Sequence, residues 1–524
     1  MITPKKQLIL CLIAGLASGA VSANTPDVVR TAYGDLQGFL KKVPGTQLET
    51  DVFLGVPYAS PVTGDKRWTK AQPPRKWEGI RSADRAPQPC RQNSIGSEDC
   101  LYVNIYRPAG TKPDAKLPVG VYAHGGANIV GNASDHDGAR IAAENGVIIV
   151  TVQYRMGAFG FLRLPGMDPE TAGNFGVSDT EEALRWVKAN IAAFGGDGNK
   201  VTLMSESAGS TNACRILVDT KFKGGVDAVM LQSEDCLHDV DTTAQSKERA
   251  DKFLALTGCD QADDKLACVR KLSGNKIAEA SAAVGWWNPV SDVPAVTAIA
   301  KGDWIKVPVL TGSNKEEGRA AGAAYIGWTE ADYKAWVKKL LGENAEAGLA
   351  QYPISRHTGK YALEYTMGDF ITDSGMRGLG GCTNMTLSEA LAKAGTPVFW
   401  YSFEDSAIPT AKKQADYDNA ASHAAELTYL FPDAGSYFAL SQKMNSSQQK
   451  LARDMRAYWA NFVRNHNPNG KGLAQWKPFK SDNGFIMALR LDGKSRSEPA
   501  KYFSELHRCS FWRSIPIVLD RGDR

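Results

Sequence analysis

The chain has 524 residues, of which 43% are hydrophobic and 23% are charged, close to the ~45–50% and ~25% of ordinary globular proteins. The formal net charge of +4 is small for this length, and no long run of Lys or Arg occurs. The sequence therefore predicts neither a nucleic-acid partner nor attraction to an anionic membrane surface. The length is sufficient for a large hydrophobic core.

The N-terminus has the pattern of an export signal. Lys5 and Lys6 form a positive segment, residues 8–20 form an apolar segment, and residues 21–23 (Val-Ser-Ala) form a small-residue cleavage site. We therefore expect a signal peptide over residues 1–23 and a secreted or periplasmic protein. No apolar stretch reaches the ~20 residues that a membrane-spanning helix needs, so no membrane span is predicted.

Cysteine usage agrees with export. Nine cysteines occur, and Cys11 falls within the expected leader. The other eight form an even set, for which disulfides are permitted outside the cytosol: Cys90, Cys100, Cys214, Cys236, Cys259, Cys268, Cys382 and Cys509. None of them has Cys-x-x-Cys spacing, and no His-x-x-x-His occurs, so we expect no structural metal. No cofactor is predicted.

Beyond the leader, short β-branched runs alternate with amphipathic helical stretches. The expected strands lie at residues 119–123, 147–152, 201–204, 228–231, 307–310 and 398–401. The helical period appears in residues 181–191 and again from Met455 to Val463. This alternation predicts an α/β fold with a mostly parallel central sheet flanked by helices. We expect a single domain over residues 24–524, with helical insertions near 240–300 and 320–395.

The expected strand 201–204 runs into Ser205-Glu206-Ser207-Ala208-Gly209, and a helical stretch follows. A serine on a sharp strand-to-helix turn is a nucleophile elbow, usually written Gly-x-Ser-x-Gly. Ser205 occupies the first position here, which requires a small residue. The turn raises the hydroxyl of Ser207 above the sheet, and the helix N-terminus favours a developing anion. Taken alone, these five residues also fit an ordinary strand–turn–helix.

Several longer motifs resemble the type-B carboxylesterase family, to which the cholinesterases belong. They are residues 194–209, 97–104 (Ser-Glu-Asp-Cys-Leu-Tyr-Val-Asn), 53–59, 154–161 and 458–462. The resemblance extends from about Val28 to Trp512 and suggests a secreted esterase of the bacterial type. It implies the α/β-hydrolase fold.

The resemblance also implies an oxyanion hole. His124-Gly125-Gly126-Ala127 follows an expected strand and is similar to the glycine-rich loop of the family. The donors implied are the backbone amides of Gly126, Ala127 and Ala208. The family usually has an aromatic residue after this loop, whereas this chain has Asn128. We expect that substitution to make the pocket wall more polar.

The remaining catalytic residues are implied by two later loops. Residues 312–318 resemble the acid loop of the family, which indicates Glu317, with the neighbouring Glu316 as the alternative. Residues 422–427 resemble the histidine loop and indicate His423. The order Ser207, Glu317, His423 is the serine–acid–histidine order of α/β-hydrolases.

Other residues are implied as supporting the site. By resemblance they are Glu206, Glu426 and Ser233. Glu234 stands where the family usually has glycine, and the sequence gives no interpretation of this carboxylate. Arg67 with Glu98, and Arg155 with Asp179, resemble structural ion pairs. The implied disulfides are Cys90–Cys100, Cys259–Cys268 and Cys382–Cys509, with Cys214 and Cys236 either paired or free.

These residues predict a serine hydrolase that cleaves a small-molecule carboxylic ester through an acyl-enzyme on Ser207. Two alternatives stay open: a catalytically inactive, cholinesterase-like binding or adhesion protein, and the same chemistry on an amide, a thioester or a lactone. Only nine residues separate Cys90 from Cys100, and none is tryptophan, so choline recognition by cation–π contact is not expected there. The sequence leaves the acyl chain length and the oligomeric state open.

Overall fold

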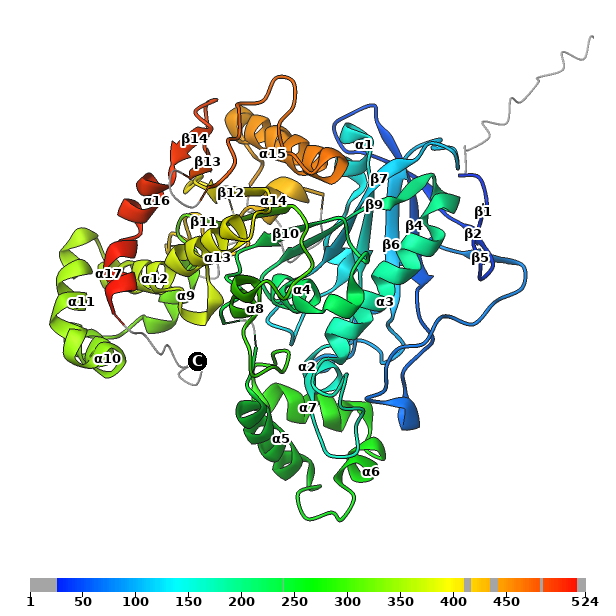
Figure 1. Cartoon of the computed structure of the whole chain (residues 1–524), viewed down its shortest axis with the longest axis horizontal. Helices are drawn as coiled ribbons and strands as arrows, with labels where there is room; N and C mark the ends of the chain where they lie inside the picture. The colour runs from blue at the N-terminus through cyan, green and yellow to red at the C-terminus, as the bar shows by residue number, and fades with distance from the viewer. Residues whose placement is uncertain (1–25, 239, 410–415, 434–441, 481–483, 516–524) are drawn as a thin grey trace, which may run out of the picture.

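The computed structural model describes residues 26–238, 240–409, 416–433, 442–480 and 484–515. The expected signal peptide lies outside these residues. The centre of the molecule is an eleven-stranded sheet (Figure 1). From one edge to the other it runs β14 (Arg496–Pro499), β13 (Phe485–Leu489), β12 (Val398–Phe403), β11 (Val309–Asn314), β10 (Ala228–Gln232), β9 (Gly196–Glu206), β7 (Leu117–Ala123), β8 (Ile148–Val152), β6 (Tyr102–Pro108), β4 (Glu49–Pro57) and β3 (Phe39–Lys42).

All neighbouring pairs from β13 to β8 are parallel, and both edges of the sheet are antiparallel. The predicted α/β class with a mostly parallel sheet is therefore confirmed. A second, small sheet joins β1 (Val29–Arg30), β2 (Asp35–Gln37) and β5 (Ile80–Ser82).

The central strands are apolar because both faces of the sheet are covered. Along β7, Val119 and Val121 pack into one hydrophobic cluster, whereas Tyr122 packs into another. Successive side chains of a strand point to opposite faces, so one strand serves two cores. Helix α3 (Phe175–Asn190) and helix α4 (Ala208–Val218) contact β9 on one side, and α15 (Ser446–Asn465) contributes to the core on the other (Figure 1).

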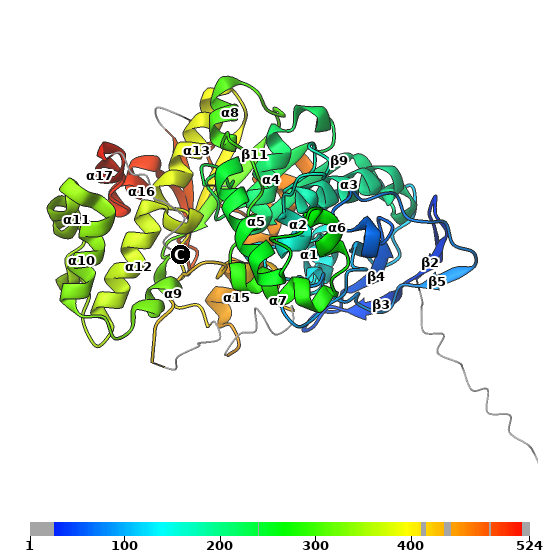
Figure 2. The same ribbon diagram turned by 90° about the horizontal axis from the view of Figure 1, so that it is seen from below.

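Further helices follow β10 and β11, in the segments where insertions were expected. After β10 come α5 (Thr243–Thr257), α6 (Lys265–Arg270), α7 (Gly274–Val284) and α8 (Ala295–Lys301). After β11 come α9 (Arg319–Gly322), α10 (Glu330–Leu341), α11 (Ala345–Gln351), α12 (Ala362–Ser374) and α13 (Gly381–Lys393). Figure 2 shows α10 and α11 at one end of the molecule beside α12, and this end has a hydrophobic cluster of its own.

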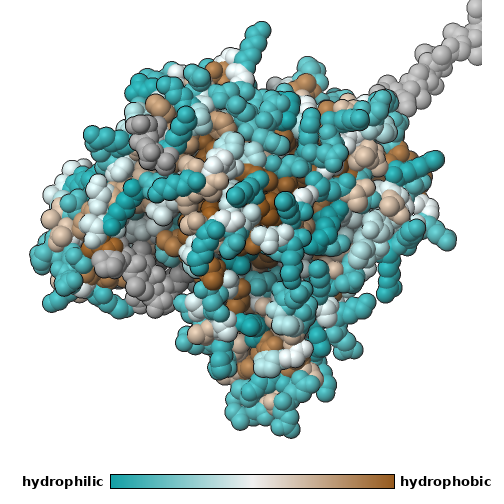
Figure 3. Space-filling model, viewed as in Figure 1, coloured by the Kyte–Doolittle hydropathy of each residue, from teal (hydrophilic) through white to brown (hydrophobic). Residues whose placement is uncertain are grey.

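The remaining helices are short. They are α1 (Ala139–Asn145), α2 (Gly157–Phe161), α14 (Leu427–Leu430), α16 (Ala500–Leu506) and α17 (Cys509–Ser514). The face shown in Figure 3 is largely hydrophilic, with hydrophobic residues in small separated patches. Among the described residues, no helix combines the length and the apolar composition needed to cross a bilayer.

Four disulfides connect these elements: Cys90–Cys100, Cys214–Cys236, Cys259–Cys268 and Cys382–Cys509. The second, which the sequence left open, links α4 to the loop that follows β10. Cross-links of this kind stabilise a fold mainly by restricting the unfolded chain. Four disulfides are consistent with an extracellular protein.

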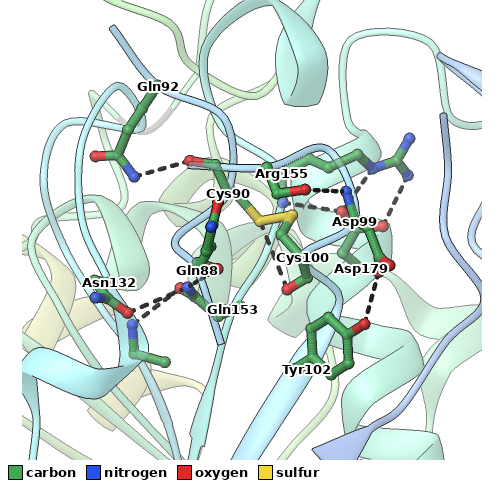
Figure 4. Close-up of a disulfide and its surroundings, with 12 residues drawn as sticks. Gln88, Cys90, Gln92, Asp99, Cys100, Tyr102, Asn132, Gln153, Arg155 and Asp179 are labelled. Atoms are coloured by element: carbon green, nitrogen blue, oxygen red, sulfur yellow. Dashed lines mark hydrogen bonds and ion pairs between the residues drawn. A yellow bond between two sulfur atoms is a disulfide. The ribbon is translucent and has the colours of Figure 1, made fainter. Parts of the chain in front are cut away.

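Near the first disulfide lies a buried ion pair, shown in Figure 4. The guanidinium of Arg155 donates two hydrogen bonds of 2.8 Å to the two carboxylate oxygens of Asp179. The backbone amide of Arg155 donates a third, of 3.0 Å. The Arg155 and Asp179 residues are 3% and 0% exposed, so neither charge is accessible to water. The pair fixes the start of α3 to the segment that follows β8.

Removing one member of this pair should be strongly destabilising. We expect Asp179→Ala to lower the free energy of unfolding by about 3–5 kcal/mol, because Arg155 would remain charged and buried without its partner. Chemical denaturation monitored by circular dichroism measures the change. The control is Glu170→Ala, which removes the partner of Lys221 in an exposed ion pair and should change nothing measurable. Equal effects of the two substitutions would contradict the prediction.

Candidate active site

The nucleophile candidate lies at the junction of β9 and α4. Strand β9 ends at Glu206, helix α4 begins at Ala208, and Ser207 between them has a φ of +53°. This left-handed backbone is the sharp turn of a nucleophile elbow. A Cβ atom on Gly209 would lie 2.2 Å from the carbonyl oxygen of Ala123, so the first turn of α4 approaches β7 too closely for any larger residue. The geometry supports the interpretation of the motif as an elbow.

Ser205 fits the first position of the elbow because its hydroxyl has partners inside the sheet. Its Oγ donates a hydrogen bond of 2.7 Å to the carbonyl oxygen of Met230 and lies 3.0 Å from Oγ of Ser210. The side chain is fully buried. A buried hydroxyl with hydrogen-bond partners carries little desolvation cost, which explains how serine replaces the usual glycine here.

Two further loops at the carboxyl edge of the sheet bring the other candidates to Ser207. Glu317 follows β11 and His423 follows β12. The Nε2 atom of His423 lies 2.8 Å from Oγ of Ser207, and its Nδ1 atom lies 2.7 Å from Oε2 of Glu317. The three side chains therefore form one continuous hydrogen-bonded chain, although they are widely separated in sequence.

The carboxylate of Glu317 is fully buried, and its other oxygen, Oε1, also accepts hydrogen bonds. Oε1 accepts a hydrogen bond of 2.6 Å from Oγ of Ser233 and one of 2.7 Å from the amide of Asn314. Ser233, which the resemblance implies as a supporting residue, therefore contacts the carboxylate of Glu317 directly.

Glu316, the alternative acid, points to a different loop. Its carboxylate accepts hydrogen bonds from Oγ of Ser406, at 2.9 Å, and from the amide of Ala421, at 3.1 Å. It makes no hydrogen bond to His423 within the described residues. Of the two neighbouring glutamates, only Glu317 has the geometry of the acid.

Two more buried carboxylates surround the histidine. Oε1 of Glu206 lies 3.3 Å from Nε2 of His423. Glu426 accepts hydrogen bonds from Nε2 of Gln232, at 3.0 Å, and from Nδ2 of Asn314, at 2.6 Å. Burial raises the pKa of both carboxyl groups above the usual range. Both residues implied as supporting the site are therefore within the same charged cluster.

The charges of this cluster act on the histidine. Burial alone would lower the pKa of His423, but the negative charge of Glu206 and the hydrogen bond and charge of Glu317 together raise it above its ordinary value. Because burial also favours a proton on Glu206, the two side chains compete for protons. When Glu206 is protonated, the main charge that raises the pKa of His423 is absent, and the imidazole can act as a base.

The three residues whose amides are expected to form the oxyanion hole line the cavities at Ser207. Gly126 has a φ of +107°, and a Cβ atom there would lie 1.8 Å from the carbonyl oxygen of Val130, so only glycine fits. Ala127 follows with a φ of +57°. In the described part of the chain, the amides of Gly126, Ala127 and Ala208 donate no hydrogen bond. Donors left unpaired beside a nucleophile suit a developing oxyanion.

The expectation for Asn128 was wrong. Its side chain is fully buried, and Oδ1 accepts a hydrogen bond of 3.0 Å from Nδ2 of Asn212 on α4. It does not line the cavity at Ser207. The polar group is directed into the interior because it bonds the oxyanion loop to the helix, so it does not make the pocket wall polar.

A cavity of about 650 Å³ opens over Ser207 and His423. Its walls are mostly hydrophobic and include Ile95, Trp286 and Leu379, which belong to none of the sequence motifs described above. Trp287, the neighbour of Trp286, is instead buried in the core at 2% exposure. Nothing in the local sequence distinguishes these lining residues from ordinary hydrophobic ones.

Neither histidine beside the oxyanion loop suits a role as a base. Burial lowers the pKa of His124 to about 4 and that of His136 to about 3. His124 lies in the loop itself, and His136 lines the large cavity. Both imidazoles are therefore neutral near pH 7, and only His423 contacts the serine within the described residues. No group of three or more potential metal ligands occurs in that part of the chain.

Comparisons with known proteins identify the family of the chain. A model of the Carboxylesterase family matches residues 25–512. The chain is 31% identical to an acylcarnitine hydrolase of Mus musculus, over 91% of this chain and 90% of that protein. It is 29% identical to carboxylesterase 1D of Rattus norvegicus, over 94% and 96%. It is 28% identical to a medium-chain fatty acyl-CoA hydrolase precursor of Anas platyrhynchos, over 99% of both chains. The chain belongs to the carboxylesterase family and is a carboxylic ester hydrolase with the α/β-hydrolase fold.

Proposed function

We propose that this enzyme cleaves small-molecule carboxylic esters through an acyl-enzyme on Ser207, with His423 as the general base and Glu317 as the residue that orients it. The observation that carries the proposal is the hydrogen-bonded chain from Glu317 through His423 to Ser207, with distances of 2.7 Å and 2.8 Å. These are the separations that nucleophile activation requires.

The steps follow from this geometry. Oγ of Ser207 attacks the carbonyl carbon while Nε2 of His423 takes the hydroxyl proton. The oxyanion is stabilised by the amides of Gly126, Ala127 and Ala208. The bond between the carbonyl carbon and the alcohol oxygen then breaks, and the imidazolium donates its proton to the leaving alcohol. Water repeats the sequence on the acyl-enzyme and releases the acid, which regenerates the free serine. Glu317 holds the imidazole tautomer and stabilises its protonated form.

Two other functions can be distinguished from ester hydrolysis. A non-catalytic binding protein on the same scaffold would not need the three hydrogen-bonded side chains, so their presence favours the enzyme. Thioester cleavage is the second candidate, because one relative is named a fatty acyl-CoA hydrolase. Fold alone does not distinguish these substrates.

We also propose that the mature protein is secreted or periplasmic and consists of one catalytic domain. The four disulfides support an oxidising compartment. The bacterial-type origin and the leader over residues 1–23 stay predictions.

The nucleophile can be tested directly. We expect Ser207→Ala to abolish hydrolysis of 4-nitrophenyl acetate and labelling by a fluorophosphonate probe, because both reactions need the serine oxygen. Absorbance of nitrophenolate and in-gel fluorescence measure the two losses. Ser205→Ala, which removes the neighbouring buried hydroxyl, is the control and should remain labelled. A Ser207→Ala protein that still turns over ester would exclude the proposed mechanism.

The acid can be distinguished from its neighbour. Glu317→Gln should lower kcat on the order of 10⁴-fold, because the amide no longer fixes the imidazole tautomer or stabilises its positive charge. Glu316→Gln should lower it far less, since Glu316 contacts the loop and not the imidazole. Steady-state kinetics of the two purified variants give the comparison. A larger loss for Glu316→Gln would reverse the assignment.

The charge of Glu206 should be visible in the pH dependence. Activity requires a neutral His423, and the negative charge of Glu206 raises the pKa of that histidine. Glu206→Gln removes the charge, so the rising limb of kcat/KM against pH should move to lower pH. The surface variant Glu170→Gln should leave the limb in place. A shift to higher pH, or none, would show that Glu206 does not set the protonation of the histidine.

A further inference from the structure

Two cavities of very different size meet at Ser207. The large one, of about 650 Å³, is lined by His423, Ala424 and Ile95. The small one, of about 30 Å³, is lined by Ala208, Thr211, Ser233, Glu234 and Asn288. Trp286 and Leu379 line both cavities. The two halves of an ester bound at Ser207 must therefore occupy unlike spaces.

Proton transfer determines which half of the ester lies where. The imidazolium of His423 must reach the oxygen of the leaving alcohol, because it donates the proton when that bond breaks. Of the two cavities, His423 lines only the large one. The alcohol therefore lies in the large cavity, named here the alcohol cavity. The acyl group, on the other side of the carbonyl carbon, enters the small one, named here the acyl cavity.

The acyl cavity has little room. Its volume of about 30 Å³ is small beside the 650 Å³ of the alcohol cavity. A space of this size suits a short acyl chain such as acetyl or propionyl. The polar side chains of Thr211, Ser233, Glu234 and Asn288 make its wall unfavourable for a longer alkyl chain.

Glu234 is held rigidly in that wall. Its Oε2 accepts a hydrogen bond of 2.5 Å from Oγ1 of Thr211, and its Oε1 accepts from the amides of Asp235 and Cys236, at 3.0 Å and 3.3 Å. Cys236 is joined by a disulfide to Cys214 on α4, the helix that also carries Thr211. Glu234 is 4% exposed and its carboxylate is hydrogen-bonded to a cross-linked unit, so it cannot move aside easily for a longer acyl chain.

We propose that this enzyme selects esters of a short acyl group, acetyl or propionyl, with a bulky apolar alcohol, and that Glu234 sets the acyl limit. The inference rests on the proposed function, since it uses Ser207 and His423 as the reacting groups. In the first step the serine–acyl bond forms and the acyl–alcohol bond breaks. The serine proton leaves with the alcohol, so no further reactant is needed until water hydrolyses the acyl-enzyme.

Two isomeric esters test the orientation. They are 2-naphthylmethyl acetate, with a small acyl group and a large alcohol, and methyl 2-naphthylacetate, with the sizes reversed. The two esters have the same molecular formula. Dividing each enzymatic rate by the rate of alkaline hydrolysis of the same ester corrects for the difference in intrinsic reactivity. We expect kcat/KM of the wild-type enzyme to favour the acetate on the order of 100-fold. Equal rates, or a preference for the methyl ester, would overturn the proposal without any variant.

Variants then test the residue. Glu234→Ala opens the wall and should reduce the preference for acetate over butyrate among 4-nitrophenyl esters at least tenfold. Glu234→Gln keeps the volume and removes the charge, so the acyl limit should remain. The matched control on the other side is Ile95→Ala, at an exposed position of the alcohol cavity, which should raise KM for the naphthylmethyl ester and leave the acyl limit unchanged.

Fluorophosphonate labelling separates the possible failures. If the wild-type enzyme is labelled and hydrolyses both isomers without preference, the cavity assignment is wrong and the serine chemistry stands. If a folded wild-type protein is neither labelled nor active, both the proposed function and this inference are wrong. If Glu234→Ala is folded, as circular dichroism would show, and keeps the acyl limit, Glu234 does not set it.

Discussion

The left-handed backbone of Ser207 is the constraint on which the site depends. The chain changes from strand to helix over this one residue, and its φ of +53° costs on the order of 1–3 kcal/mol in a residue with a side chain. The surrounding structure permits this turn because glycine occupies the positions where the backbone passes closest to its neighbours. A Cβ atom on Gly125 would lie 2.9 Å from Cβ of Ser207, and one on Gly209 would contact the carbonyl oxygen of Ala123. The strained turn keeps the hydroxyl at the carboxyl edge of the sheet.

Parallel strands bring the other two groups to the same edge, and backbone hydrogen bonds fix them there. The amide of His423 donates to the carbonyl oxygen of Glu317, at 3.0 Å, and the amide of Glu316 donates to the carbonyl oxygen of Ala421, at 3.1 Å. The acid loop and the histidine loop are therefore paired along their backbones. The imidazole is positioned by this pairing as well as by the carboxylate, so the geometry does not depend on one side-chain contact.

The sequence predicted the parts of the molecule that are determined locally. Apolar runs such as Ile148–Val150 are fully buried in a strand because their side chains are apolar on both faces of the sheet. The elbow at Ser207 was predicted because its turn requires small neighbours. The direction of the Asn128 side chain and the different positions of Trp286 and Trp287 were not predictable, because each depends on contacts with a segment far away in the chain. The sizes of the two cavities are set by such contacts alone.

The departures of this chain from the usual family pattern have unequal consequences. Ser205 and Asn128 are buried and hydrogen-bonded inside the fold, so they preserve the turn and the oxyanion loop. Ala424 takes a φ of +64° where glycine is usual, at a small cost in backbone strain. Glu234 adds a long side chain to the small cavity at the serine, whereas Ala424 adds only a methyl group to the large one. Three departures therefore leave the reacting groups in position, while the fourth changes the space for substrate. Under the proposed mechanism, the departure at Glu234 therefore bears on which acyl group is accepted and not on how the ester is cleaved.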